Sequence, residues 1–139
     1  MTNTINMEDM RHINLFEKIT KIQTRLYFHY NRTIYFCVPE KFLGKAIGQK
    51  GKNIRKTGLL LKKRVKIISQ PKDINDIEKF IKAIVEPINF KSVEVTEDEI
   101  IITAGNKQNK ASLLGRNKTR LSEMQKIIRN FFEKDLRIK

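Results

Sequence analysis

Two glycines lie three residues apart at Gly48 and Gly51, and this spacing most constrains what the chain can form locally. Glycine has no Cβ, so it adopts positive φ angles and lets another backbone or a phosphate come close. Apolar residues flank the pair, with Ile47 before it and Ile54 after it. The pattern predicts a turn between two helices, with the free N–H groups and the positive dipole end of the second helix beside the glycines. Such a turn is a candidate anion-binding site.

The charged residues are unevenly distributed around this turn. Segment 41–66 carries basic side chains and no acidic one, segment 73–99 is mostly acidic, and segment 107–120 is basic again. The whole chain has a net charge of +14. A protein of this kind usually meets a polyanion, of which nucleic acid is the first expectation and an acidic membrane surface the second. Basic charge concentrated near a turn favours binding to a nucleic-acid backbone over a merely solvated surface.

The hydrophobic pattern predicts one order of elements twice: helix, two strands, short helix, turn, helix, strand. Asn6 is expected to cap the first helix, and Asn31 is expected in the turn of the first hairpin. The ranges expected in the first copy are 6–19, 24–29, 33–38, 42–47, 48–51, 52–61 and 65–69. Those expected in the second copy are 73–86, 91–96, 99–104, 110–114, 115–118, a helix from 119, and 136–138.

The two copies indicate an internal duplication. Gly115 follows Gly48 by 67 residues, and the same offset places Ile34 on Ile101 without a gap. The last helix of the second copy is expected to be a few residues longer. We therefore expect an α+β protein with two domains, 1–70 and 71–139. Each domain should hold a three-stranded mixed sheet with helices packed on one face.

Known catalytic and nucleotide-binding patterns do not fit this sequence. A phosphate-binding loop of the Walker type fails because Ala46 stands where its first glycine belongs and Asn53 where its hydroxyl belongs. His12 and His29 have no nucleophile or carboxylate partner by spacing, and both are expected at the surface or its boundary. Cys37 is the only cysteine and falls in an alternating apolar run, so we expect a buried strand residue and no disulfide. These residues offer no familiar zinc spacing. We expect no enzyme activity, no metal and no cofactor.

The sequence also bears on where the protein works. No apolar run reaches the roughly 20 residues that span a bilayer, and residues 1–10 have no signal-peptide core. We expect a cytoplasmic protein, monomeric and without membrane contact.

The run Ile47-Gly48-Gln49-Lys50-Gly51-Lys52-Asn53-Ile54 resembles the signature of KH domains, in which a glycine turn clamps the backbone of about four nucleotides. The order of the elements resembles the type II form, which implies two tandem type II KH domains. The second copy departs from the signature because Lys118 stands at the second glycine position of its turn, 115–118. A Cβ there should hold RNA further away or force a strained φ.

The resemblance extends to the archaeal NusA-like transcription factors. It rests on the tandem arrangement, on residues 46–54 and on the run Leu-Phe-Glu-Lys-Ile at 15–19. It implies single-stranded RNA binding in transcription elongation or termination, with RNA polymerase as a partner. The alternative is an interaction module that docks on the ribosome or polymerase and binds RNA outside transcription.

Single-stranded RNA is expected to follow both turns, with bases on an apolar floor formed by Ile47, Ile54 and the strand near Val38. The expected RNA contacts are Lys45, Ile47, Gly48, Gln49, Lys50, Gly51, Lys52, Asn53, Ile54, Arg55, Lys56, Gly115, Arg116, Asn117, Lys118 and Arg120.

Overall fold

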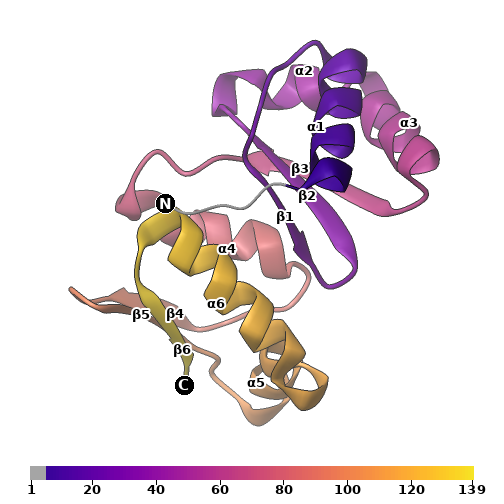
Figure 1. Ribbon diagram of the computed structural model, residues 1–139. Coiled ribbons are helices and arrows are strands. Elements are labelled where there is room, and N and C mark those ends of the chain that lie inside the picture. The colour runs from indigo at the N-terminus through magenta and orange to yellow at the C-terminus, as the bar shows by residue number, and fades with distance from the viewer. Residues whose placement is uncertain (1–5) are drawn as a thin grey trace. The chain divides into compact units, whose positions relative to one another are not determined.

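The computed structural model describes residues 6–139, so the first five residues of the chain lie outside the description (Figure 1). Contacts among the described residues divide the chain into two compact units, residues 6–70, called unit 1, and residues 71–139, called unit 2. Both have mixed α and β structure with one three-stranded sheet, as expected for the α+β class.

Unit 1 begins with a helix, continues with a hairpin and ends with a strand after two further helices. Its elements are α1 (Met7–Thr20), β1 (Tyr27–Tyr30), β2 (Thr33–Val38), η1 (Glu40–Phe42), α2 (Leu43–Ile47), η2 (Gln49–Gly51), α3 (Lys52–Leu61) and β3 (Arg64–Ser69). The strand order is β1-β2-β3. Strands β1 and β2 are antiparallel, whereas β2 and β3 are parallel. The sheet is therefore mixed, as predicted.

Local interactions fix the start of α1, and local backbone conformation fixes the hairpin turn. The Asn6 side chain accepts a hydrogen bond from Asp9 N at 2.8 Å, and Asp9 Oδ2 accepts one from Asn6 N at 3.3 Å. This capping box confirms Asn6 as the cap. The hairpin turns at Asn31 and Arg32, whose φ angles of 51° and 57° suit a two-residue turn.

The first strand is shorter at its start than the predicted range 24–29. The Thr24 hydroxyl donates a hydrogen bond to the Cys37 carbonyl at 2.6 Å. This side-chain bond replaces the backbone N–H bond that regular strand pairing would make to the same oxygen. Regular pairing begins only at Tyr27, which lies opposite Phe36. Strand β1 then extends to Tyr30, one residue beyond the end of the predicted range.

The core of unit 1 lies between the sheet and its helices. Ile34, Phe36 and Val38 alternate along β2, are fully buried and pack in one cluster, so they share one face of the sheet. The Phe16 ring of α1 stacks on the Phe36 ring with centroids 4.2 Å apart and planes at 9°. Ala46 of α2 joins the same cluster. The helix that ends at the glycine turn is thus anchored in the core.

Unit 2 repeats this order with different lengths. Its elements are η3 (Ile74–Asp76), α4 (Ile77–Val85), β4 (Ser92–Val95), β5 (Glu99–Thr103), α5 (Lys107–Leu114), η4 (Arg116–Lys118), α6 (Thr119–Phe132) and β6 (Asp135–Ile138). The strand order is β4-β5-β6, with an antiparallel and then a parallel pair. Asp73 accepts a hydrogen bond from Asn75 N at 2.9 Å and starts a 3₁₀ turn, so the α-helix begins at Ile77 and not at Asp73 as predicted.

The repeat contains a one-residue shift that the sequence did not show. Tyr27 pairs with Phe36 in unit 1, and Val93 pairs with Ile102 in unit 2, so both hairpin positions differ by 66 residues and not 67. The prediction that Ile34 corresponds to Ile101 is therefore wrong by one residue. The prediction of a longer last helix is confirmed, since α6 has 14 residues and α3 has 10.

Within residues 6–139, no helix is long and apolar enough to cross a membrane.

Replacing Phe16 by alanine should destabilise unit 1 by about 3–5 kcal/mol, because a fully buried ring and its stacking on Phe36 are lost. Urea unfolding followed by far-UV circular dichroism would measure the change in the free energy of unfolding. Met7→Ala, on the same helix at 83% exposure, should change stability by no more than about 0.5 kcal/mol. Similar costs for the two variants would contradict the assigned core.

Candidate functional site

The turn between α2 and α3 has a backbone that depends on its first glycine. Gly48 has φ 81° and ψ 163°, a combination that is essentially restricted to glycine. Lys50 (φ 54°, ψ 30°) and Gly51 (φ 72°, ψ 20°) follow in the left-handed region. The chain therefore reverses within a few residues and enters α3 directly.

The two glycines differ in the space around them. A Cβ on Gly48 would lie 3.0 Å from the backbone nitrogen of Asn53 and from two of its side-chain atoms. A Cβ on Gly51 would meet its nearest neighbour, Arg55 Nη1, at 3.4 Å, which is an ordinary contact. The first glycine is thus needed for both conformation and space. The second position accepts another residue that tolerates the left-handed region.

Side chains of α3 hold the turn in place. Asn53 Nδ2 donates to the Lys45 carbonyl at 3.2 Å, and the Arg55 guanidinium donates to the Lys50 carbonyl. The Thr57 hydroxyl donates to the Asn53 carbonyl at 2.7 Å and is fully buried. Two predicted RNA contacts, Asn53 and Arg55, therefore also stabilise the turn itself.

The turn in unit 2 has nearly the same backbone although it lacks the second glycine. Gly115 has φ 75° and ψ 171°, and Asn117 has φ 56° and ψ 28°. Lys118 takes φ 58° and ψ 28°, so the lysine is accommodated with a positive φ, one of the two outcomes expected from the sequence. A Cβ on Gly115 would lie 2.5 Å from Arg120 Cγ. Arg120 thus packs under the turn, and its guanidinium lies 3.0 Å from Glu123 Oε1.

The predicted contact residues divide by exposure. Those that are half-buried are Ile47, Gly48, Gly51, Asn53, Ile54, Gly115 and Arg120. Those that are exposed are Lys45, Gln49, Lys50, Lys52, Arg55, Lys56, Arg116, Asn117 and Lys118. Ile47 and Ile54 pack against the core of unit 1. Each turn therefore presents basic and polar side chains around a half-buried backbone.

One part of the predicted apolar floor is wrong. Val38 has 0% exposure because it faces the helices in the core of unit 1. It cannot contact a base, whereas Ile47 and Ile54 keep part of their surface accessible.

The structure also brings together histidines that sequence spacing kept apart. The Tyr27 hydroxyl lies 2.7 Å from both His12 Nδ1 and His29 Nε2. Asp9 Oδ1 lies 3.8 Å from His29 Nε2, and Glu8 Oε1 lies 3.8 Å from His12 Nε2. The expectation that these histidines lack carboxylate neighbours is therefore wrong, and His12 is buried rather than at the surface.

Burial changes the acid–base behaviour of this cluster. It lowers the pKa of His12 below its usual 6.5, and the charges of His29 and Lys63 act in the same direction, while Glu8 and Asp9 oppose them. Burial also raises the pKa of Tyr27 well above its usual range, so the phenol stays neutral. The spacing of Asp9 and His12 on one helix face was a signal in the sequence. Their approach to His29 depends on the strand register, which the sequence does not reveal.

Cys37 is fully buried on β2, as predicted, and burial raises the pKa of its thiol. The residue belongs to the interior and not to the site.

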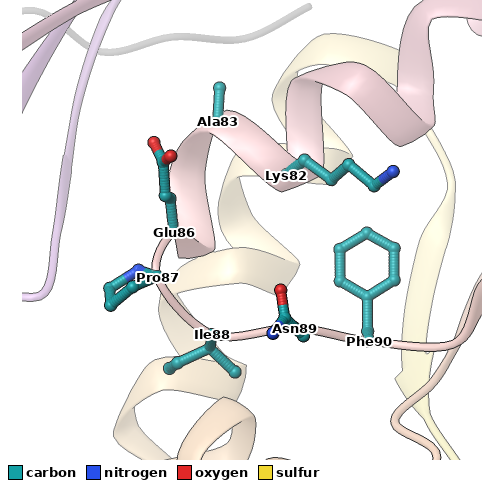
Figure 2. A pocket seen from close by; sticks show the side chains of 7 residues that line it. All are labelled: Lys82, Ala83, Glu86, Pro87, Ile88, Asn89 and Phe90. Atoms are coloured by element: carbon teal, nitrogen blue, oxygen red, sulfur yellow. The ribbon is translucent and has the colours of Figure 1, made fainter.

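A pocket of about 640 Å³ lies in unit 2 at the end of α4, away from both turns in the sequence. Figure 2 shows that Lys82 and Glu86 project from the helix in different directions while Phe90 lies on the loop that follows. The pocket is lined by Lys82, Ala83, Glu86, Pro87, Ile88, Asn89 and Phe90. None of the predicted contact residues lies in it, so the candidate site is the surface of the turns.

Comparisons with known proteins support a NusA-like relationship and the fold. The chain is 33% identical over 91 residues to the probable transcription termination protein NusA of Methanococcus vannielii, a match that covers 66% of this chain. The chain spans about half, 51%, of that curated relative. The crystal structure of APE1850 matches 97% of this chain and 100% of its own with a TM-score of 0.68 at 21% identity. No family model matches the chain.

Gly48→Ala should destabilise unit 1 by more than Gly51→Ala does. The first substitution places a side chain in a glycine-only region, at about 1–3 kcal/mol, and adds the close approach to Asn53. The second costs about 1 kcal/mol, since alanine enters the left-handed region there with adequate space. Urea unfolding of both variants measures the difference, and equal costs would contradict the asymmetry of the turn.

Acidification should weaken unit 1 partly through His12. Because its folded pKa lies below the usual 6.5, the unfolded chain binds more protons, and stability present above 6.5 is lost as the pH falls toward the folded value. His12→Gln removes that contribution. The difference in free energy of unfolding between wild type and His12→Gln should therefore become smaller from pH 7.5 to pH 5.5. Urea unfolding midpoints at the two pH values measure this difference. A difference that does not change with pH would contradict the lowered pKa of His12.

Proposed function

We propose that the protein binds single-stranded RNA at the Gly48–Gly51 turn and acts in transcription elongation or termination. The observation that carries the proposal is the coincidence of a glycine-dependent turn with exposed basic side chains at the start of α3. Lys45, Lys50, Lys52 and Lys56 are all exposed near it. No acidic residue occurs in segment 41–66 to offset them.

The chemistry of the turn suits a phosphate backbone. The first N–H groups of a helix have no partner within the helix, and its dipole places partial positive charge there. Because Gly48 and Gly51 lack side chains, a phosphate can approach these groups closely. The lysines add charge-assisted contacts. Ile47 and Ile54, half-buried beside the turn, offer apolar surface for a base.

We assign each unit to the type II KH fold. In support, both have the order helix, two antiparallel strands, helix, turn, helix and a third strand parallel to the second. The turn falls between the second and third α-helices of its unit, where KH domains bind RNA. Domain 1 is then residues 1–70 and domain 2 is residues 71–139.

Unit 2 is a second RNA contact in this proposal, weaker than the first. Its turn keeps the backbone of the first, and Arg116 and Lys118 add exposed positive charge. The Lys118 side chain, however, occupies space that Gly51 leaves open for a phosphate.

The role in transcription draws support from the similarity to a probable transcription termination protein. RNA polymerase is the partner that this role requires. We propose a cytoplasmic monomer that acts by binding and not as an enzyme. The alternative, a module that docks on the ribosome or polymerase and binds RNA outside transcription, would use the same basic surface, and the similarity to a probable transcription termination protein does not favour it.

Replacing Gln49 and Lys50 together by aspartate should abolish binding of short single-stranded RNA. Two carboxylates then face the phosphates, while aspartate tolerates the left-handed conformation of position 50. Fluorescence anisotropy with labelled RNA measures the loss, and for the wild type log K should fall by about 0.7 per contacted phosphate per decade of salt.

The control is Asn89→Asp with Lys91→Asp, which changes the net charge equally at exposed positions in the acidic segment. It should bind RNA nearly as wild type, whereas Arg116→Asp with Asn117→Asp should weaken binding partially. Duplex RNA and single-stranded DNA of the same length should bind less tightly. Full RNA binding by the folded Gln49/Lys50 double variant would reject the proposal, and so would a wild type without affinity for RNA.

A further inference from the structure

Three potential metal ligands converge in unit 1 although they come from two elements. His12 Nδ1 and His29 Nε2 each lie 2.7 Å from one atom, the Tyr27 hydroxyl oxygen, which occupies the point that both nitrogens face and hydrogen bonds to both rings. Asp9 Oδ1 lies 3.8 Å from His29 Nε2. One ligand atom from each of these three residues lies within 4.8 Å of the others.

We propose that Asp9, His12 and His29 bind a zinc ion. Imidazole nitrogen and carboxylate oxygen bind Zn²⁺ at about 2.0–2.2 Å, so two ligands of one tetrahedral ion lie roughly 3.4 Å apart. Asp9 Oδ1 and His29 Nε2 are 3.8 Å apart, about 0.4 Å more than this. All three ligand atoms lie within 4.8 Å of one another, at most about 1.4 Å more, a difference that side-chain rotation can close. Three protein ligands leave the fourth position to water.

The capping box at the start of α1 fixes the first ligand. Asp9 Oδ2 accepts the hydrogen bond from Asn6 N, which leaves Oδ1 directed toward His29. His12 follows three residues later, so it shares a face of the helix with Asp9. Its side chain is only 8% exposed and that of Asp9 is 18% exposed. The helix therefore holds two ligands with little freedom, and β1 supplies the third.

The groups around the ligands fit a metal site as well. Glu8 Oε1 lies 3.8 Å from His12 Nε2, the nitrogen that faces away from the proposed ion. A carboxylate near the second nitrogen of a ligating histidine can orient the ring and increase its basicity. The Tyr27 hydroxyl bonds to both imidazoles in the structure, so zinc binding requires it to turn aside and to exchange these hydrogen bonds for one to a ligand or to bound water. Cys37, the only thiol of the chain, is fully buried and cannot compete for the metal.

A zinc ion at this place would link the start of α1 to the first strand of the sheet. The link is separate from the RNA turn, which lies between α2 and α3. Metal binding and RNA binding can therefore be tested independently.

The test uses tag-free protein titrated with zinc chloride, because an affinity tag of histidines would bind the metal itself. Isothermal titration calorimetry should give one site per chain. The chain has two histidines, so a nitrogen-15 correlation spectrum of the imidazoles reports on both ligands separately. Both rings should shift on addition of zinc, and EDTA should reverse the shifts.

Three variants decide the assignment. His29→Ala changes a side chain that is 46% exposed, so the fold should persist, and zinc affinity should fall by at least about tenfold. Asp9→Asn should cause a similar loss. Glu17→Gln removes the same charge further along α1 and should bind zinc as wild type. Unshifted histidine signals in the wild type, or equal affinity in His29→Ala, would overturn the proposal.

Discussion

Both turns depend on one backbone conformation that only glycine reaches without strain. Gly48 and Gly115 combine φ near 80° with ψ above 160°, and in each case a side chain from the following helix fills the space where a Cβ would be. Because this conformation reverses the chain abruptly, the next helix starts with its N–H groups beside the turn. The location of the candidate site is thus decided by a single residue in each unit. The second glycine position has a weaker requirement, since Gly51 and Lys118 both adopt the left-handed region there, the lysine at moderate cost. The lysine in the second turn therefore changes its surface chemistry while leaving its backbone nearly unchanged.

Features that depend on near neighbours in the chain could be predicted from the sequence. The cap at Asn6, the hairpin turn at Asn31 and the glycine turn each arise from side chains or backbone within a few residues, and the structure has all three. The ends of elements were less predictable where a side chain competes with regular pairing. Thr24 is such a case, because its hydroxyl bonds to a carbonyl of the neighbouring strand.

Features that depend on strand register could not be obtained in this way. Ile100, Ile101 and Ile102 are all apolar, so the sequence does not show which of them face the core. The offset of 66 appears only when the pairing of Val93 with Ile102 is compared with that of Tyr27 with Phe36. The error at Val38 has another cause: the residue alternates in phase with the buried Ile34 and Phe36, so its side chain faces the core and not the surface beside the turn. The unknown register also concealed the cluster of Asp9, His12 and His29, because the strand residue approaches the helix only after the sheet has formed. Sequence spacing shows which residues share an element, while contacts between elements require the fold.

The contacts within the first turn separate residues that shape the site from residues that can face a ligand. Arg55 donates to the Lys50 carbonyl and Asn53 donates to the Lys45 carbonyl, so both support the left-handed backbone. Removing either would alter the geometry and the charge together, and a loss of binding would have two explanations. The side chains of Gln49 and Lys50 are exposed. A change of charge at these two positions therefore alters the electrostatics of the turn while its glycines and its supporting hydrogen bonds stay in place, which separates the binding chemistry of the site from its stability.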